Sequence, residues 1–311
     1  MEYRTLGKTG IKVSKLAFGG SSLGSVFRSV AEEDGIRAVH TALDHGINLI
    51  DTAPYYGATK AETVLGKALK GVSRDRYLLA TKVARFGPEI GDFDFSAARV
   101  ASSIEESLGR LGVDHFDFIQ VHDMEFGNID QIVTETIPAL REAQLQGKAR
   151  FIGITCLPVR LFKLVMDRIE VDQIQSYCHY GLNDTALADI LPYLREKQVG
   201  IFNSAPLAMR LLTQEGPPSW HPAPAEVTAK CAEAAAFCAS QGADLAKLAL
   251  QFSVAHPDIH TTIVGTANPD RIMENIRQIE EPLDNALLAK VQEILKPIHN
   301  VTWPSGRPEN N

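Results

Sequence analysis

The sequence predicts an α/β fold, a (β/α)8 barrel, from three observations. Short apolar runs of about three to seven residues alternate with longer helical patterns, eight times along the chain. Strands separated by whole helices must be parallel, because an antiparallel hairpin needs no such crossover. The turn after the first of these runs, 18–24, does not fit the Gly-x-Gly-x-x-Gly pattern of an open nucleotide-binding sheet. Together these observations favour a closed barrel over the open doubly wound sheet.

The elements follow in order. Residues 3–14 hold two extended pieces around Gly7–Gly10, which predicts a small β-hairpin before the barrel. Ser29 and Glu32 have the spacing of a capping box, for a helix that runs to His45. The eight strands are expected at 16–19, 49–51, 77–82, 116–122, 151–154, 173–175, 200–204 and 262–264. The other helices are expected at 61–69, 96–111, 129–146, 158–167, 187–197, 225–240, 245–255 and 269–279.

Length and composition limit the class of protein. A length of 311 residues fits one barrel, so we expect a single domain over 1–311 with extra helices and loops at the carboxyl end. The net charge of −7 argues against nucleic acid as a partner, since phosphate binding needs a basic face. The sequence shows no run as apolar as a membrane helix and no signal-peptide core at its start, so we expect no membrane partner and a cytoplasmic location. We also expect a monomer or a weak homo-oligomer.

The cysteines and histidines do not suggest a metal centre. The spacing of Cys156, Cys178, Cys231 and Cys238 contains no CxxC pair, and no histidine cluster has zinc-ligand spacing. Free, mostly buried thiols are therefore expected, and no metal.

Polar side chains stand at the ends of three neighbouring strands, where the active site of a barrel lies. Asp51 ends the second strand, Lys82 the third and His122 the fourth, and Tyr56 follows in the loop after Asp51. Each has a plain structural alternative: Asp51 could cap a turn, Lys82 could reach solvent, and His122 could be a satisfied core histidine. Four such groups converging on one barrel mouth are less easily a coincidence.

The four residue types suit proton transfer. A lysine that points into a barrel needs a partner, and Asp51 is the natural one. The ammonium beside Tyr56 is expected to lower the pKa of that phenol from about 10 toward working pH. Tyr56 would then exchange a proton with an alcohol or carbonyl oxygen that His122 orients, while a cofactor carries the hydride. Tyr55 is expected to be a packing neighbour.

These segments resemble those of the aldo-keto reductases over nearly the whole chain. The resemblance is carried by 51–57, by Thr81-Lys82 and Val121-His122, and by the opening 4–10, 147–153 and 263–265. It implies that Tyr56 is the acid/base, that Lys82 and Asp51 tune it and that His122 positions the substrate. It also implies an extended NAD(P)(H) across the barrel mouth without a Rossmann domain.

The resemblance implies cofactor positions as well. Thr155 and Gln175 match positions that contact the carboxamide, and Ser204 departs from the aromatic residue that many members stack on nicotinamide. Gly265 stands where NADP-preferring members often have a lysine, and Arg271 either serves a 2′-phosphate or lies against adenine. We therefore expect NAD, with NADP possible. The matching positions are Thr155, Gln175, Ser204, Pro206, Leu207, Gly265, Thr266, Arg271, Glu274 and Asn275.

Three further segments, 176–181, 216–222 and 300–306, are similar to the group of L-galactose and L-fucose dehydrogenases within that family. This similarity implies an NAD(P)-dependent sugar 1-dehydrogenase that oxidises the anomeric hydroxyl of L-galactose or an L-fucose-like aldose to the lactone. Trp220 and Trp303 could pack against the sugar, although either could be a structural plug. The alternatives are a general NADPH-dependent aldehyde or ketone reductase and a nicotinamide-binding regulatory subunit.

Overall fold

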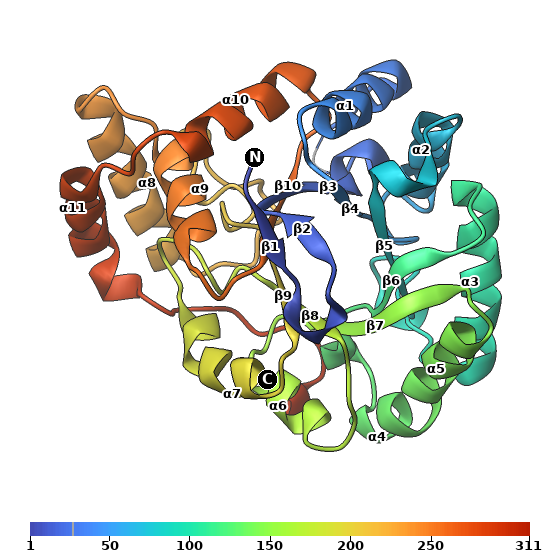
Figure 1. Cartoon of the computed structure of the whole chain (residues 1–311). Coiled ribbons are helices and arrows are strands. Elements are labelled where there is room, and N and C mark those ends of the chain that lie inside the picture. Colours follow the sequence, from blue (N-terminus) through green and yellow to red (C-terminus); the bar gives the residue numbers. More distant parts are fainter. Residues whose placement is uncertain (27) are drawn as a thin grey trace.

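The computed structural model describes residues 1–26 and 28–311, and within them eight parallel strands close into a barrel (Figure 1). The sheet order is β10-β3-β4-β5-β6-β7-β8-β9, so each strand pairs with its neighbours in the chain and β10 closes the ring on β3. The strands are β3 Leu16–Gly19, β4 Leu49–Asp51, β5 Leu78–Val83, β6 Phe116–Val121, β7 Ala149–Cys156, β8 Gln173–Tyr177, β9 Gly200–Ser204 and β10 Thr261–Gly265. The predicted barrel and all eight predicted strands are confirmed.

The amino-terminal hairpin is confirmed too. Strand β1, Tyr3–Thr5, pairs antiparallel with β2, Lys12–Ser14, and lies across one end of the barrel (Figure 1). Leu6 and Val13 of the hairpin pack with buried, inward-facing residues of six strands, such as Leu49 and Phe118. The hairpin therefore plugs the amino-terminal end of the barrel and leaves the carboxyl end for chemistry.

The helices surround the barrel (Figure 1). They are α1 Glu32–Asp44, α2 Lys60–Leu69, α3 Ala97–Leu111, α4 Ile129–Gln131, α5 Ile137–Leu145, α6 Arg160–Met166, α7 Leu191–Glu196, α8 Ala225–Ser240, α9 Leu245–Ala255, α10 Pro269–Glu280 and α11 Asn285–Leu295. Helix α11 was not among the predicted helices, although Asp284 caps its start and Leu287, Val291 and Leu295 have helical spacing.

Three helix predictions need correction. The capping box at Ser29 is wrong: α1 begins after Ala31, and its first turn carries Glu32, Glu33 and Asp34, whose charges favour a helix start.

The helix expected at 129–146 contains a π-helical segment, Ile132–Thr136, before α5. Pro138 has no N–H to donate to the preceding turn, which accounts for the irregular ladder there. The helix expected at 187–197 is α-helical only over α7 and starts with a 3-10 segment, Ala186–Ile190.

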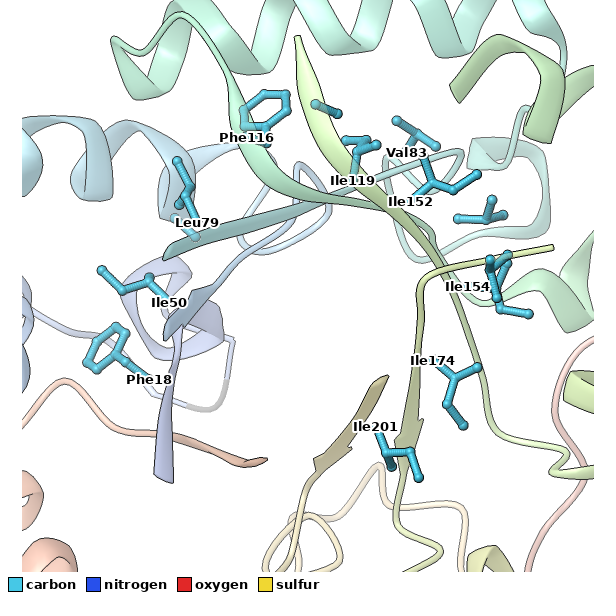
Figure 2. Packing of buried hydrophobic residues seen from close by; sticks show 14 of the residues in the cluster. Phe18, Ile50, Leu79, Val83, Phe116, Ile119, Ile152, Ile154, Ile174 and Ile201 are labelled. Carbon is cyan, nitrogen blue, oxygen red and sulfur yellow. The ribbon is translucent and has the colours of Figure 1, made fainter. Parts of the chain in front are cut away.

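The main hydrophobic core lies between the sheet and the helices. Figure 2 shows outward-facing side chains of successive strands, among them Ile50, Leu79 and Ile119, in this layer. Since side chains alternate along a strand, the residues between them face the barrel interior. This alternation places Asp51, Lys82 and Gln120 inside, where all three are buried.

A buried carboxylate connects this outer layer to the strand that carries Lys82. Glu62 on α2 accepts hydrogen bonds from the Thr81 hydroxyl at 2.6 Å, from Ser107 at 3.2 Å and from Arg110 Nε at 2.7 Å. These contacts join α2, α3 and β5.

We predict that Glu62→Ala lowers the free energy of unfolding by about 3 kcal/mol, because it leaves Arg110 and two hydroxyls without their buried acceptor. The control is Glu105→Ala, which removes an exposed partner of Lys148 and should cost less than about 1 kcal/mol. Urea denaturation followed by circular dichroism measures both. Equal, small losses would show that the buried carboxylate does not hold these elements together.

Candidate active site

A buried ion pair joins β4 and β5 at the carboxyl end of the barrel. Lys82 Nζ lies 2.8 and 2.7 Å from the two carboxylate oxygens of Asp51, and it donates to the Thr52 carbonyl at 2.8 Å. The side chains of Lys82 and Asp51 are only 1% and 2% exposed. Burial works to lower the pKa of Lys82, but Asp51 and Tyr56 outweigh it and raise that pKa. The ammonium is therefore charged although it is buried.

The predicted proton-transfer residue lies next to this pair. The Tyr56 hydroxyl is 3.4 Å from Lys82 Nζ, and the ammonium lies 5.0 Å from the centre of the Tyr56 ring. Burial raises the pKa of Tyr56 to about 12, while Lys82 lowers it by less and Asp51 raises it further. The expectation that Lys82 brings this pKa below 10 is therefore wrong, because burial and the carboxylate oppose the ammonium. At neutral pH Tyr56 is a neutral phenol that can donate a proton.

His122 follows β6 and completes the group. Its ring lies 5.8 Å from the Tyr56 ring and 5.9 Å from the Tyr55 ring, edge-on to both. Burial lowers the pKa of His122 to about 3, so the imidazole is neutral and can donate only through one nitrogen. Within the described residues its Nδ1 has no hydrogen-bond partner. The structure thus brings together the four side chains that the sequence singled out.

A second layer of polar side chains lies beneath the ion pair, and part of it was not predicted from the sequence. Gln120 donates to Asp51 Oδ1 at 3.1 Å, and Gln173 donates to Gln120 Oε1 at 2.7 Å. Gln175 lies 3.4 Å from Asp51 Oδ2. Strand alternation could have predicted these residues, because residues two apart in a strand face the same side. Gln120 lies two residues before His122, and Gln173 two residues before Gln175. These amides hold the Asp51 carboxylate in place.

The residues expected near a nicotinamide offer suitable partners. The buried Oε1 of Gln175 has no hydrogen-bond partner in the described part of the chain, so it can accept from a carboxamide NH2. Thr155 accepts from the Asp123 N–H at 2.9 Å and keeps its own hydroxyl proton to donate. Ser204 is half-buried and donates to the Ser176 carbonyl at 3.2 Å. This donor and acceptor set fits a carboxamide group.

The remaining predicted cofactor positions lie on β9, β10 and the segments that follow them. Pro206 and Asn275 are buried, Leu207 and Thr266 are half-buried, and Gly265 is exposed. A Cβ at Gly19, opposite Gly265, would lie 3.0 Å from the Gly265 nitrogen, so the two strand ends approach closely there. Arg271 is exposed and pairs with Glu274 at 2.8 Å.

Both tryptophans lie against the ring of His221. Trp303 is 7% exposed and lies edge-on to His221, with ring centres 5.0 Å apart. Trp220 is 54% exposed and stacks on the same ring at 6.5 Å. Trp303 also belongs to a hydrophobic cluster with residues of α8, α9 and α11, so it packs the segment after α11 into the layer that these helices form. This packing is what the structural alternative for Trp303 predicts.

Glu125, which was not among the predicted site residues, holds the segment after α11 through its contact with Ser305. Its Oε1 accepts from Ser305 at 2.9 Å, from Tyr177 at 3.2 Å and from the Leu157 N–H at 3.2 Å. Burial, followed by the charge of Asp123, raises the pKa of Glu125 to about 8. Glu125 Oε2 is buried and has no partner among the described residues, so no donor stabilises the charged form at that oxygen.

Because the folded-state pKa of Glu125, about 8, exceeds the unfolded value of 4.5, its contribution to stability is complete below pH 4.5 and is lost as pH rises toward 8. We predict that Glu125→Gln, which keeps an acceptor for Ser305, removes this loss. Between pH 5 and pH 8 the wild type should lose at least ~1 kcal/mol more unfolding free energy than the variant. Urea denaturation at both pH values measures this, and identical pH dependence would contradict it.

The four cysteines are free and buried, as expected. No helix in the described part of the chain is long and apolar enough to cross a membrane.

Comparison with known proteins gives the family. A profile of the Aldo/keto reductase family matches residues 15–296. The chain is 49% identical to L-galactose dehydrogenase of Arabidopsis thaliana, over 100% of this chain and 99% of that protein, and 28% identical to D-arabinose 1-dehydrogenase of Saccharomyces cerevisiae, over 95% of each. The solved structure of aldo-keto reductase AKR11C1 from Bacillus halodurans, in its holo form, has a TM-score of 0.80 and 28% identity, and covers 98% of both chains. The fold, the site and these similarities together establish that the chain belongs to the aldo/keto reductase family.

Proposed function

We propose that this chain is an NAD(P)-dependent sugar 1-dehydrogenase, which oxidises the anomeric hydroxyl of L-galactose or an L-fucose-like aldose to the lactone. The main support for this reaction is the position of Lys82. Its buried ammonium pairs with Asp51 and lies 3.4 Å from the Tyr56 hydroxyl. The identity of the sugar is inferred from a relative that is 49% identical over the whole chain and is named L-galactose dehydrogenase. Relatives named as aldose dehydrogenases at lower identity support the same class of reaction.

The residues of the chain divide the proton chemistry between them. His122 donates a hydrogen bond to the sugar C1 oxygen and places it against the Tyr56 hydroxyl. In the oxidation Tyr56, as phenolate, takes the proton of the C1 hydroxyl, and the C1–O bond becomes the lactone carbonyl. Lys82 favours the phenolate that this step needs, and Asp51 keeps Lys82 charged and oriented. In the reverse direction the neutral phenol returns the proton.

The family implies a nicotinamide cofactor, and the oxidised form, when bound, accepts the hydride that leaves C1. Gln175 and Thr155 would hold the carboxamide, as their acceptor and donor atoms suit that group. Ser204, Pro206 and Leu207 would border the nicotinamide and pyrophosphate. The segment that would take the adenosine end comprises Gly265, Thr266, Arg271, Glu274 and Asn275.

We propose NAD as the preferred form. Gly265 offers no cation for a 2′-phosphate, and the carboxylate of Glu274 partly neutralises Arg271 at 2.8 Å. An acidic group at this end suits a free ribose hydroxyl better than a phosphate.

The wild type should therefore have a higher kcat/KM with NAD than with NADP. Arg271→Ala should lower kcat/KM with NADP by about tenfold, the equivalent of ~1.4 kcal/mol, and leave the value with NAD within about threefold. Steady-state kinetics with both cofactors at saturating sugar gives the two ratios. An equal fall for both cofactors would indicate that Arg271 lies against adenine instead.

The main test compares initial rates with L-galactose plus NAD and with an aromatic aldehyde plus NADPH. We expect a higher rate with L-galactose plus NAD. We also expect Tyr56→Phe to lower turnover by about 10²–10⁴-fold without unfolding the protein, because the hydroxyl is the proposed proton-transfer group. A marked preference for the aldehyde with NADPH would favour the general reductase. Tyr56→Phe with near wild-type turnover would contradict the proposed acid/base, and absence of turnover with either pair would favour the regulatory subunit.

A further inference from the structure

A second buried ion pair lies beside His122 and has no part in the proton transfer described above. Asp123 directly follows His122, and its carboxylate pairs with Arg85, which lies just beyond β5. The side chains are 5% and 17% exposed. Burial works to raise the pKa of Asp123, but the His122 ring and the Arg85 guanidinium more than offset it and lower that pKa. An ionised carboxylate, paired with a guanidinium, therefore lies next to His122.

The backbone holds Asp123 in an unusual conformation. Its φ is 48° and its ψ is 59°, in the left-handed region that residues other than glycine seldom adopt. The conformation is held by the Asp123 N–H, which donates to the Thr155 hydroxyl at 2.9 Å, and by a turn in which the Phe126 N–H donates to the Asp123 carbonyl at 3.0 Å. Strain of this kind persists where the surrounding structure enforces it, and it is concentrated at functional sites.

Arg85 connects the pair to the reacting groups. Its guanidinium lies 3.7 Å from the centre of the half-buried Tyr55 ring. The rings of Tyr55, Tyr56 and His122 form a triangle with centres 5.8 to 5.9 Å apart. The triangle has Lys82 on its Tyr56 corner and Arg85 on its Tyr55 corner. The Arg85–Asp123 pair is therefore part of the same small assembly as the acid/base.

The distance between His122 and Asp123 leaves room for two oxygen atoms of a bound substrate. His122 Nε2 and Asp123 Oδ2 are 3.7 Å apart, which is too far for a direct hydrogen bond. With Nε2 protonated, a donor and an anionic acceptor stand side by side. Two oxygens on neighbouring carbon atoms match this arrangement: the reacting oxygen accepts from His122, and the next hydroxyl donates to the carboxylate. A simple aldehyde has no second hydroxyl to offer.

We propose that Asp123, held by Arg85, is a specificity-determining residue that binds the C2 hydroxyl of the sugar. This inference rests on the proposed function, since it concerns the substrate of the same site. It would explain how a site with reductase geometry prefers a polyol: without that hydroxyl, the Asp123 carboxylate keeps the Arg85 guanidinium but loses a second hydrogen-bond donor.

The test compares kcat/KM for L-galactose and for 2-deoxy-L-galactose, which differ only in the C2 hydroxyl. The wild type should favour L-galactose by about 10- to 100-fold, the range expected for one hydrogen bond to a charged group. In Asp123→Ala this ratio should fall to about threefold or less. The ratio is the decisive readout, because general damage to the fold lowers both values together.

Two further variants complete the design. Asp123→Asn tolerates the left-handed backbone and keeps a neutral acceptor, so its ratio should lie between those of the wild type and Asp123→Ala, and it decides the matter if the alanine variant does not fold. The matched control is Asp117→Asn, which alters a buried, arginine-paired aspartate at the other end of β6 and should leave the ratio unchanged.

The outcomes separate this inference from the proposed function. If the wild type does not oxidise L-galactose, the proposed function fails and this inference fails with it. If the wild type oxidises both sugars equally well, or if Asp123→Ala and Asp123→Asn keep the wild-type ratio, only the role of Asp123 is overturned.

Discussion

The site depends on one constraint: a lysine ammonium has to stay charged inside a barrel. Lys82 is 1% exposed, and the desolvation of such a group would neutralise it without a partner. Asp51 provides both carboxylate oxygens, and Gln120 fixes one of them from below. Since Asp51 and Lys82 come from adjacent strands, the register of the sheet itself sets the geometry of the pair. The positions of Asp51 and Lys82 are therefore fixed by the barrel itself.

The same constraint affects the protonation of Tyr56, the proposed acid/base. Burial keeps Tyr56 protonated at neutral pH, and the ammonium at 3.4 Å is the one opposing influence among the charges that act on it strongly in the described residues. Lys82 therefore limits the cost of forming the phenolate and does not abolish it. His122, kept neutral by burial, can offer a hydrogen bond and adds no competing charge. The Arg85–Asp123 pair places a carboxylate directly after the imidazole in the chain, with the Arg85 guanidinium over the Tyr55 ring.

Much of this could be predicted from the sequence, for identifiable reasons. The strands and the closed barrel follow from apolar runs separated by helices, and Asp51, Lys82 and His122 follow from their places at strand ends. Gln120 and Gln173 could have been found from strand alternation alone. The net pKa of Tyr56 could not, because it is a difference between burial and two opposite charges at distances that only the fold sets. The role of Glu125 depends on contacts with Ser305, 180 residues away in the chain, which no local pattern encodes.

The central claim is that Lys82 and Tyr56 act as one unit, and a double-mutant cycle tests it most directly. The kcat/KM for L-galactose would be measured for Lys82→Met, for Tyr56→Phe and for the variant that carries both. If Lys82 acts through the Tyr56 hydroxyl, the double variant should lose no more than about threefold beyond the more damaging single variant. Losses that multiply would contradict the account, since they would show that Lys82 contributes to the reaction independently of Tyr56.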